Sequence, residues 1–264
     1  MKLQLLPLGI NGFIPSHGRQ TMSFLLLGED EALLLDAGSG VARLVESEIA
    51  GRLASLSRLD VLLTHYHLDH VVGLSYLPGV WRGRPLRLFA PGRPLVDAEP
   101  QAALAQLLSP PLFPVTLERW PLPVEVVPVR EESLEIGSLH LRLRRQRHPG
   151  GSVGVRVGDV LAYCTDTAMD EGTADFVRGV GTLLHEVWLS DEEAAVEDAG
   201  RLGHSAAGAV ADLARRAAVG RLAPVHHHPR RQQAELESMA RGMAERSGLA
   251  VELLTEGRPL ALES

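Results

Sequence analysis

The chain has 264 residues, a formal net charge of −7 and 45% hydrophobic residues. A chain of this length fits one large domain with a sizeable core, and no apolar run approaches the roughly 20 residues of a membrane-spanning helix. The acidic balance argues against a broad basic surface for nucleic acid. The single cysteine, Cys164, excludes an intramolecular disulfide and a zinc site made of several cysteines. Any bound metal must therefore be held by histidine and carboxylate.

The N-terminal segment "MKLQLLPLGING" carries one positive charge and a short apolar stretch that Pro7 interrupts. It has no small-residue cleavage site, so we interpret it as a first strand and expect a cytoplasmic protein. Short apolar runs separated by Gly, Asp and Glu predict sheet strands, several of them covered on both faces. These runs cover residues 2–8, 22–27, 31–36 and 59–64.

The middle of the chain continues with strands. Proline-rich patches at residues 109–114 and 120–128 are typical of loops around strands. The segment "GGSVGVRVGDVLAYCTDT" then predicts two strands joined by a tight turn at Gly158 and Asp159. No repeat or low-complexity tract separates these parts, so we expect one domain over residues 1–264.

Strands alternate with amphipathic helices in the last third of the chain. The first helix is predicted over residues 205–219, with Ser205 as its N-terminal cap and Gly220 at its end. The second is predicted over residues 230–246 and ends at Gly248, before a final strand "LAVELL". This order indicates an α/β protein with two packed mixed sheets and helices on their outer faces, an αββα sandwich.

The stretch "LLTHYHLDHVVGL", residues 62–74, concentrates polar donors directly after an apolar run. In an extended segment His65 and His67 point the same way, while Asp69 and His70 begin the following turn. Imidazole nitrogen and carboxylate oxygen both suit zinc, and a catalytic site usually offers three protein ligands and an open position. Four donors are too many for one such site and too few for two. The remaining ligands should lie at the ends of other strands.

Three downstream residues have the right placement. His148 precedes a predicted strand, Asp166 ends the strand "LAYCTD", and His226 follows the short strand "RLAPV". A single histidine at a strand end is more often an ordinary surface or core residue than a ligand. The spacing His-x-His-x-Asp-His favours metal binding instead.

These residues together resemble the metallo-β-lactamase superfamily, in which "LLLDAG", "THYHLDH", His148, "TDT" and "VHHHP" occur in this order. The resemblance extends over nearly the whole chain and implies the metallo-β-lactamase fold. It implies two divalent metal ions, with zinc expected and manganese or iron as alternatives. Asp36, in "LLLDAG", would orient the ligand loop, whereas the alternative is an ordinary aspartate in the turn after a strand.

The resemblance also implies a ligand for each position. One ion takes His65, His67 and His148, the other takes Asp69, His70 and His226, and Asp166 bridges the two. Within the triplet at 226–228, family members place the ligand first, so His226 is preferred over His227. His228 is expected to face solvent.

Two further segments, "LLHEVW" and "GHSAAGAVADLARRA", resemble the tRNA 3′-processing endonuclease RNase Z and its phosphodiesterase relatives. By this resemblance Glu186 orients His204, which protonates the leaving oxygen. Such an acid is chemically sensible because an alkoxide is a poor leaving group. Asp69 is a predicted catalytic residue in a different role, because with Asp166 it tunes the metal-bound water. The alternative is that His204 caps a turn and Glu186 is a surface strand residue.

The sequence departs from those relatives in ways that bear on the substrate. Val155 stands where they often carry an aromatic residue, and only 18 positions separate His148 from Asp166. RNase Z carries its tRNA-gripping insertion between those motifs, so tRNA is not expected as a partner. True zinc β-lactamases have cysteine or serine in place of Asp166, which disfavours drug hydrolysis.

The sequence therefore predicts a dinuclear metal-dependent hydrolase that attacks a small nucleotide or related phosphodiester with a metal-activated bridging hydroxide. A rival enzyme keeps the metals and hydrolyses a lactone, thioester or sulfate ester, because fold does not decide substrate. A rival of another class binds a nucleotide with the metals and has no turnover. We expect a small-molecule substrate and no membrane, and the pattern leaves monomer and homodimer open.

Overall fold

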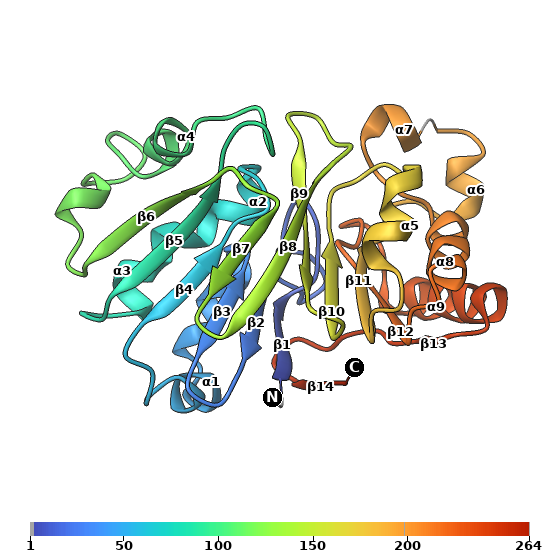
Figure 1. Ribbon diagram of the computed structural model, residues 1–264, viewed down its shortest axis with the longest axis horizontal. Coiled ribbons are helices and arrows are strands. Elements are labelled where there is room, and N and C mark those ends of the chain that lie inside the picture. Colours follow the sequence, from blue (N-terminus) through green and yellow to red (C-terminus); the bar gives the residue numbers. More distant parts are fainter. Residues whose placement is uncertain (1–2, 198, 264) are drawn as a thin grey trace. The chain divides into compact units, whose positions relative to one another are not determined.

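The computed structural model describes residues 3–197 and 199–263, and its chain divides into two compact units (Figure 1). Unit 1 comprises Met1–Arg130 and Glu256–Ala261, and unit 2 comprises Glu131–Thr255 and Leu262–Ser264. Within the described residues each unit contains one seven-stranded sheet. Among these residues, no helix combines the length and the apolar character that crossing a membrane requires.

The sheet of unit 1 has the strand order β14-β1-β2-β3-β4-β5-β6. Strands β1, β2 and β3 pair antiparallel, whereas β3, β4, β5 and β6 pair parallel. Strands β2, β3 and β4 are buried on both faces, as their continuous apolar runs predict. The strands are β1 (Leu3–Gly9), β2 (Ser23–Leu27), β3 (Ala32–Leu35), β4 (Leu59–Leu62), β5 (Leu86–Pro91), β6 (Val124–Val129) and β14 (Leu260–Leu262).

Short helices cover one face of this sheet. Buried side chains from η1, α1, η2 and α4 join strand residues in one apolar cluster, in which Trp81 is the largest fully buried side chain. Burying each large apolar side chain contributes about 1.5–3 kcal/mol, so the cluster is the main stabilising element of unit 1. The helices are η1 (Ser39–Val45), α1 (Ser47–Arg52), α2 (Leu68–Val71), η2 (Val72–Tyr76), α3 (Leu77–Val80), α4 (Pro100–Leu107) and η3 (Leu117–Arg119).

The sheet of unit 2 has the strand order β13-β12-β11-β10-β9-β8-β7. Strands β7 to β10 pair antiparallel, whereas β10 to β13 pair parallel. The turn predicted at Gly158 is present, and Gly158 adopts a φ of +48° there. The strands are β7 (Ser133–Ile136), β8 (Leu139–Gln146), β9 (Ser152–Val157), β10 (Leu161–Cys164), β11 (Thr182–Glu186), β12 (Arg221–Val225) and β13 (Ala250–Val251).

Helix α8 packs on the sheet of unit 2 (Figure 1). Val210, Ala211 and Ala214 of this helix form one apolar cluster with residues of β10, β11 and β12, and Met243 of α9 joins it. The small alanine side chains allow the helix to approach the sheet closely. The helices of unit 2 are α5 (Glu171–Val177), α6 (Asp191–Ala194), α7 (Ala199–Leu202), α8 (Ala207–Arg216) and α9 (Gln233–Ser247).

The predicted helices are present, but both cap assignments of helix α8 are wrong. Helix α9 ends at Gly248 as predicted, in the left-handed conformation. Helix α8 is not capped by Ser205, because the Ser205 hydroxyl donates to the Thr167 carbonyl and Ala206 occupies the N-cap position. The left-handed residue after α8 is Ala218, with a φ of +52°, rather than Gly220. The expected first strand includes Lys2, which lies outside the described residues.

The loop after β3 approaches η2 so closely that two glycines are required. A Cβ on Gly73 would stand 2.1 Å from the Gly38 carbonyl oxygen, and a Cβ on Gly38 would stand 2.2 Å from the Asp69 carbonyl oxygen. Two backbone hydrogen bonds join the same segments, from Gly73 N to Ala37 O at 2.7 Å and from Ala37 N to His70 O at 2.8 Å. The two glycines thus hold the loop after β3 against the segment that carries Asp69 and His70.

Changing Gly73 to Ala should destabilise the protein by about 1–3 kcal/mol, because the added methyl group overlaps backbone atoms. Gly79→Ala in α3 is the matched control, since no atom lies within 4 Å of its added Cβ. That control should leave stability unchanged or raise it slightly. Urea unfolding measures both. Equal midpoints for the two variants would contradict the close approach.

Candidate metal centre

The donors of unit 1 lie in the short segment that leads from β4 into α2. His65 and His70 are buried, whereas His67 is exposed. The ring centroid of His65 is 4.5 Å from that of His67 and 4.3 Å from that of His70. Oδ2 of Asp69 lies 3.5 Å from Nε2 of His70. The structure therefore brings all four predicted donors of unit 1 together.

A buried carboxylate, Asp36, fixes this segment from the end of β3. Its oxygens accept hydrogen bonds from Thr64 N at 2.7 Å and from Thr64 Oγ1 at 2.9 and 3.0 Å. Nδ1 of His70 lies 2.9 Å from Oδ2 of the same carboxylate. Asp36 thus joins β3 to the donor segment, which is the contact expected of a residue that orients it.

The Asp36 network also sets which nitrogen of two imidazoles carries the proton. A carboxylate only accepts, so Nδ1 of His70 donates to Asp36. Thr64 gives its proton to Asp36, and its Oγ1 therefore accepts from Nδ1 of His65 at 3.1 Å. Both imidazoles then have their lone pair on Nε2, which is the form that binds a metal ion.

Asp69 has a partner that the sequence did not indicate. The backbone N–H of Phe13, in the loop between β1 and β2, donates to Oδ2 of Asp69 at 2.7 Å. Phe13 has a φ of +64°, which is unusual for a bulky residue. No pattern around "INGFIPSHG" predicts this contact, because it depends on tertiary structure.

The donors of unit 2 lie at one edge of its sheet. Strands β10, β11 and β12 are parallel, so their carboxyl ends share an edge, and Asp166, Glu186 and His226 lie there. His148 precedes β9, which is antiparallel to β10 and therefore starts at the same edge. Oδ1 of Asp166 is 3.2 Å from Nε2 of His226, and Oδ2 is 3.5 Å from Nε2 of His148. The other two predicted donors of unit 2, His148 and His226, thus lie on either oxygen of the Asp166 carboxylate.

Three residues that follow strands in the two units have backbone conformations that glycine normally adopts. Asp36, Asp166 and His226 have φ values of +56°, +46° and +53°. Such conformations cost about 1–3 kcal/mol each and are concentrated at functional sites. The surrounding contacts therefore hold these side chains in place against a local preference.

His148 is fixed in the metal-binding form by a backbone carbonyl. Its Nδ1 lies 2.9 Å from the Gly203 oxygen, so Nδ1 donates and Nε2 keeps the lone pair. Burial lowers the pKa of His148, and the Asp166 carboxylate only partly offsets this effect. The imidazole is therefore neutral near pH 7, as a ligand must be.

The predicted relay residues are in contact. Oε2 of Glu186 lies 2.8 Å from Nδ1 of His204 and 3.6 Å from Nδ1 of His226, and Oε1 accepts from Thr167 N at 2.8 Å. Burial alone would raise the pKa of Glu186, but the imidazoles of His204 and His226 outweigh it and lower that pKa. Glu186 is completely buried, so the alternative of a surface strand residue is wrong. Its carboxylate is ionised and accepts from Nδ1 of His204.

Trp188 is a second contact that sequence reasoning missed. Its ring stacks on His204 with centroids 4.7 Å apart and an interplanar angle of 17°. The same ring meets His228 edge-on at 4.6 Å. His228 is partly buried, so the expectation that it faces solvent holds only in part. Trp188 ends the segment "LLHEVW", which the sequence analysis singled out. Nothing in that segment indicated whether the tryptophan contacts His204 or lies in the core.

The donor set fits a divalent metal ion. Ligand atoms of Asp166, His204 and His226 lie within 4.8 Å of one another, and His227 is not part of that described group. In each unit the donors are imidazole nitrogens and carboxylate oxygens, the types that zinc accepts. Backbone and side-chain acceptors fix Nδ1 of His65, His70 and His148. This orientation is typical of metal-binding histidines.

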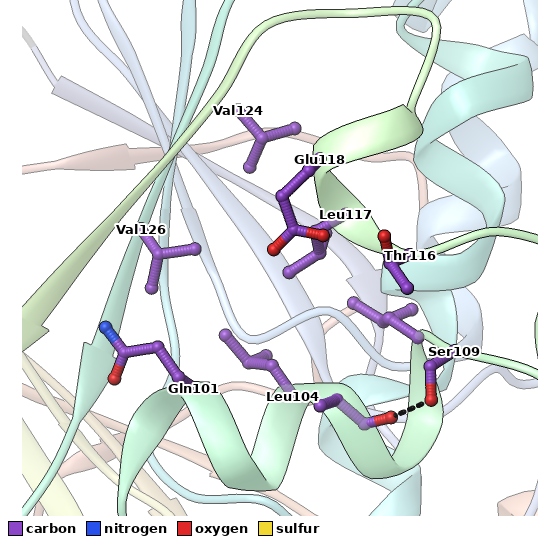
Figure 2. A pocket seen from close by; sticks show the side chains of 10 residues that line it. Gln101, Leu104, Ser109, Thr116, Leu117, Glu118, Val124 and Val126 are labelled. Atoms are coloured by element: carbon purple, nitrogen blue, oxygen red, sulfur yellow. Dashed lines mark hydrogen bonds between the residues drawn. The ribbon is translucent and has the colours of Figure 1, made fainter.

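Unit 1 also contains a cavity that is separate from the predicted donors. It has a volume of about 210 Å³ and lies between α4, η3 and β6 (Figure 2). Its wall is mainly apolar, with Leu104, Leu117, Val124 and Val126 around the Glu118 carboxylate. The predicted donors do not line it.

Comparison with known families shows which family the chain belongs to. A family model described as the beta-lactamase superfamily domain matches residues 31–227. The chain belongs to the metallo-β-lactamase superfamily. A ribonuclease Z of Synechococcus sp. strain CC9605 is 28% identical over 287 residues, which covers 86% of this chain and 87% of the relative. This superfamily member therefore lies in the RNase Z-like branch, and it is a metal-dependent hydrolase.

Solved structures confirm the predicted fold class, the αββα metallo-β-lactamase fold. The metallo-β-lactamase fold protein YhfI from Bacillus subtilis matches with a TM-score of 0.77 at 18% identity, over 99% of this chain and 100% of that chain. A diphosphatase from the PhnP family matches with a TM-score of 0.68 at 15% identity, over 98% of this chain and 97% of that chain. At these identities the likeness shows the fold alone.

Changing Asp36 to Asn should lower zinc affinity about 10- to 100-fold, because the carboxylate uses one oxygen for Thr64 N and the other for Nδ1 of His70, whereas an amide has one acceptor oxygen. It should also lower the free energy of unfolding by about 1–3 kcal/mol. Asp30→Asn, at an exposed position, is the control and should change neither. Competition with a chromogenic chelator measures the affinity. Wild-type affinity in a folded Asp36→Asn sample would remove Asp36 from the orienting role.

Proposed function

We propose that the protein is a dinuclear metal-dependent phosphodiesterase that acts on a small nucleotide or a related phosphodiester, with the whole chain as one catalytic domain. The convergence of the Asp166 carboxylate with Nε2 of His148 and His226 carries this proposal. Within each unit the donors converge, and the order of the motifs in the superfamily supports their joint use.

The proposed ligands follow that motif order. One ion takes His65, His67 and His148, the other takes Asp69, His70 and His226, and Asp166 is shared. Zinc is the expected metal because neutral imidazole and carboxylate suit it, although Mn²⁺ and iron accept the same donors. His226 is the proposed ligand of its triplet because its Nε2 lies 3.2 Å from Asp166.

The metal ions, when bound, would supply an activated water and a Lewis acid for the phosphoryl oxygen. The chain itself supplies orientation and a proton. Asp69 is held by the Phe13 N–H, and Asp36 fixes His70 beside it. These contacts keep the unit 1 donors in one arrangement while a substrate binds.

His204 is the proposed general acid. Glu186 accepts from its Nδ1 at 2.8 Å, which stabilises the protonated imidazole and leaves the Nε2 proton for transfer to the leaving oxygen. Trp188 stacks against the ring and limits its rotation. His204 therefore has a fixed orientation and a carboxylate that supports its charge, as a proton donor requires.

A small substrate is favoured over tRNA by two observations. The net charge of −7 gives little general attraction for a polyanion. The segment between His148 and Asp166 is occupied by β9, β10 and their short turn, which leaves no additional domain there.

A panel of substrates tests the reaction class. We expect the zinc- or manganese-loaded protein to release nitrophenol from an aryl phosphodiester and to leave a lactone, a thioester and an aryl sulfate unchanged. Preferential hydrolysis of one of those three would replace the phosphodiesterase proposal by the rival enzyme. Tight nucleotide binding without any product would favour the binding protein instead.

Changing His204 to Ala should slow hydrolysis of an alkyl phosphodiester about 10²- to 10⁴-fold, because an alkoxide needs a proton as it leaves. A nitrophenyl phosphodiester should be slowed much less, since nitrophenolate is stable as an anion. Glu186→Gln should follow the same trend more weakly. Elemental analysis must show unchanged metal content. If both substrates slowed equally at full metal content, His204 would be a positioning residue and the relay would be wrong.

A further inference from the structure

The loop between β1 and β2 presents apolar side chains to solvent beside the unit 1 donors. Phe13 is 68% exposed and Ile14 is 47% exposed. Leu68, within the donor motif itself, is 62% exposed. Exposed large apolar residues need a reason when they gather at a functional site.

This loop is firmly braced. Asn11 N and Ile10 N both donate to the Gln20 carbonyl, at 2.9 and 3.0 Å. Backbone bonds run in both directions between Ser16 and Arg19, at 3.1 and 2.9 Å. The Asn11 side chain donates to Ser16 Oγ at 2.8 Å and accepts from Arg19 Nε at 2.7 Å. The exposed tip of the loop is therefore held in one shape.

A buried carboxylate anchors the base of the loop. Oε1 of Glu256 accepts from Gln20 N at 2.7 Å and from Ile10 N at 3.3 Å, and Oε2 lies 3.6 Å from Arg43. Both ends of the loop are thus fixed to the C-terminal segment of unit 1. Phe13 has a fixed position because the base of the loop is anchored to Glu256 and because the Phe13 N–H donates to Asp69.

The backbone contact to Asp69 does not by itself explain a phenylalanine at this position. Any residue supplies the same N–H, and glycine adopts a φ of +64° without strain. A phenylalanine here is unfavourable in two ways, because the left-handed conformation is strained and the aromatic ring is exposed to water. The ring itself therefore has a use at the edge of the donor cluster.

A flat ring in a substrate is the partner that an exposed aromatic face fits best. Every nucleobase has such a face, and stacking on an aromatic side chain does not depend on base identity. Phe13 is tied to Asp69 by a hydrogen bond, and Leu68 precedes Asp69 in the chain. Both exposed apolar residues therefore belong to segments that contact or contain a proposed metal ligand, Asp69.

We propose that Phe13 is a specificity-determining residue on which the nucleobase of the substrate stacks. The inference rests on the proposed function, because it names the substrate class for the same site. The contact is a binding contact and includes no covalent step. The sugar and phosphate then lie toward the metal donors, while the base lies on the braced loop.

Calorimetric titration of zinc-loaded protein with AMP and with ribose 5-phosphate tests this contact without measuring turnover. Changing Phe13 to Gly should weaken AMP binding roughly 5- to 100-fold and leave ribose 5-phosphate binding unchanged, because only AMP has a base to stack. Phe13→Gly relieves backbone strain, so its melting temperature should equal or exceed that of the wild type. Loss of AMP binding then cannot reflect unfolding.

Two further variants sharpen the test. Phe13→Leu keeps an apolar side chain without a ring and should weaken AMP binding by less than Phe13→Gly. Val45→Ala removes another exposed apolar side chain of unit 1, 67% exposed, and should change nothing. Unchanged AMP affinity in Phe13→Gly, or equal weakening for both ligands, overturns the proposal. So does a wild type that binds AMP no more tightly than ribose 5-phosphate.

Failure of the proposed function gives a different result. A wild-type protein that hydrolyses no phosphodiester would contradict the phosphodiesterase proposal, whereas the AMP comparison would still decide whether Phe13 stacks on a base. Conversely, the protein could hydrolyse phosphodiesters while the Phe13 variants bind AMP as tightly as the wild type does. The phosphodiesterase proposal would then stand, and the stacking proposal would be wrong.

Discussion

The buried carboxylate of Asp36 is the interaction on which the unit 1 donors depend. It accepts from Thr64 and His70, and through Thr64 it also sets the proton position on His65. A single carboxylate thereby orients two imidazoles with their lone pairs on Nε2. Burial makes this arrangement costly to break, because an unsatisfied group in the core loses about 1–3 kcal/mol or more. In unit 2 the Gly203 carbonyl orients His148 by the same principle.

Much of this arrangement could be predicted from the sequence. Short continuous apolar runs identified the strands, and strand ends are where parallel sheets present side chains, so Asp166 and His226 could be nominated as donors from their positions. Local patterns do not encode contacts between distant segments. The bond from Phe13 to Asp69, which are 56 positions apart, and the stacking of Trp188 on His204 were therefore missed.

The failed cap at Ser205 has the same origin. A serine before an amphipathic run is a good N-cap, but the Ser205 hydroxyl donates to Thr167 O, in the turn after β10. This bond holds the residue next to His204 against the segment that follows Asp166. The tertiary contact replaced the local one, and it helps to hold His204, the proposed proton donor, in place. Glu186, His204 and Trp188 then form one packed group at the carboxyl edge of the unit 2 sheet.

Joint use of the donors of both units by two metal ions is the central claim. Crystals of zinc-loaded protein, measured at and below the zinc absorption edge, test it most directly through anomalous difference maps. We expect two peaks about 3.5–4 Å apart, both in contact with Asp166 and each with histidines from both units. A single peak, or two peaks each held by the donors of one unit alone, would contradict the dinuclear centre.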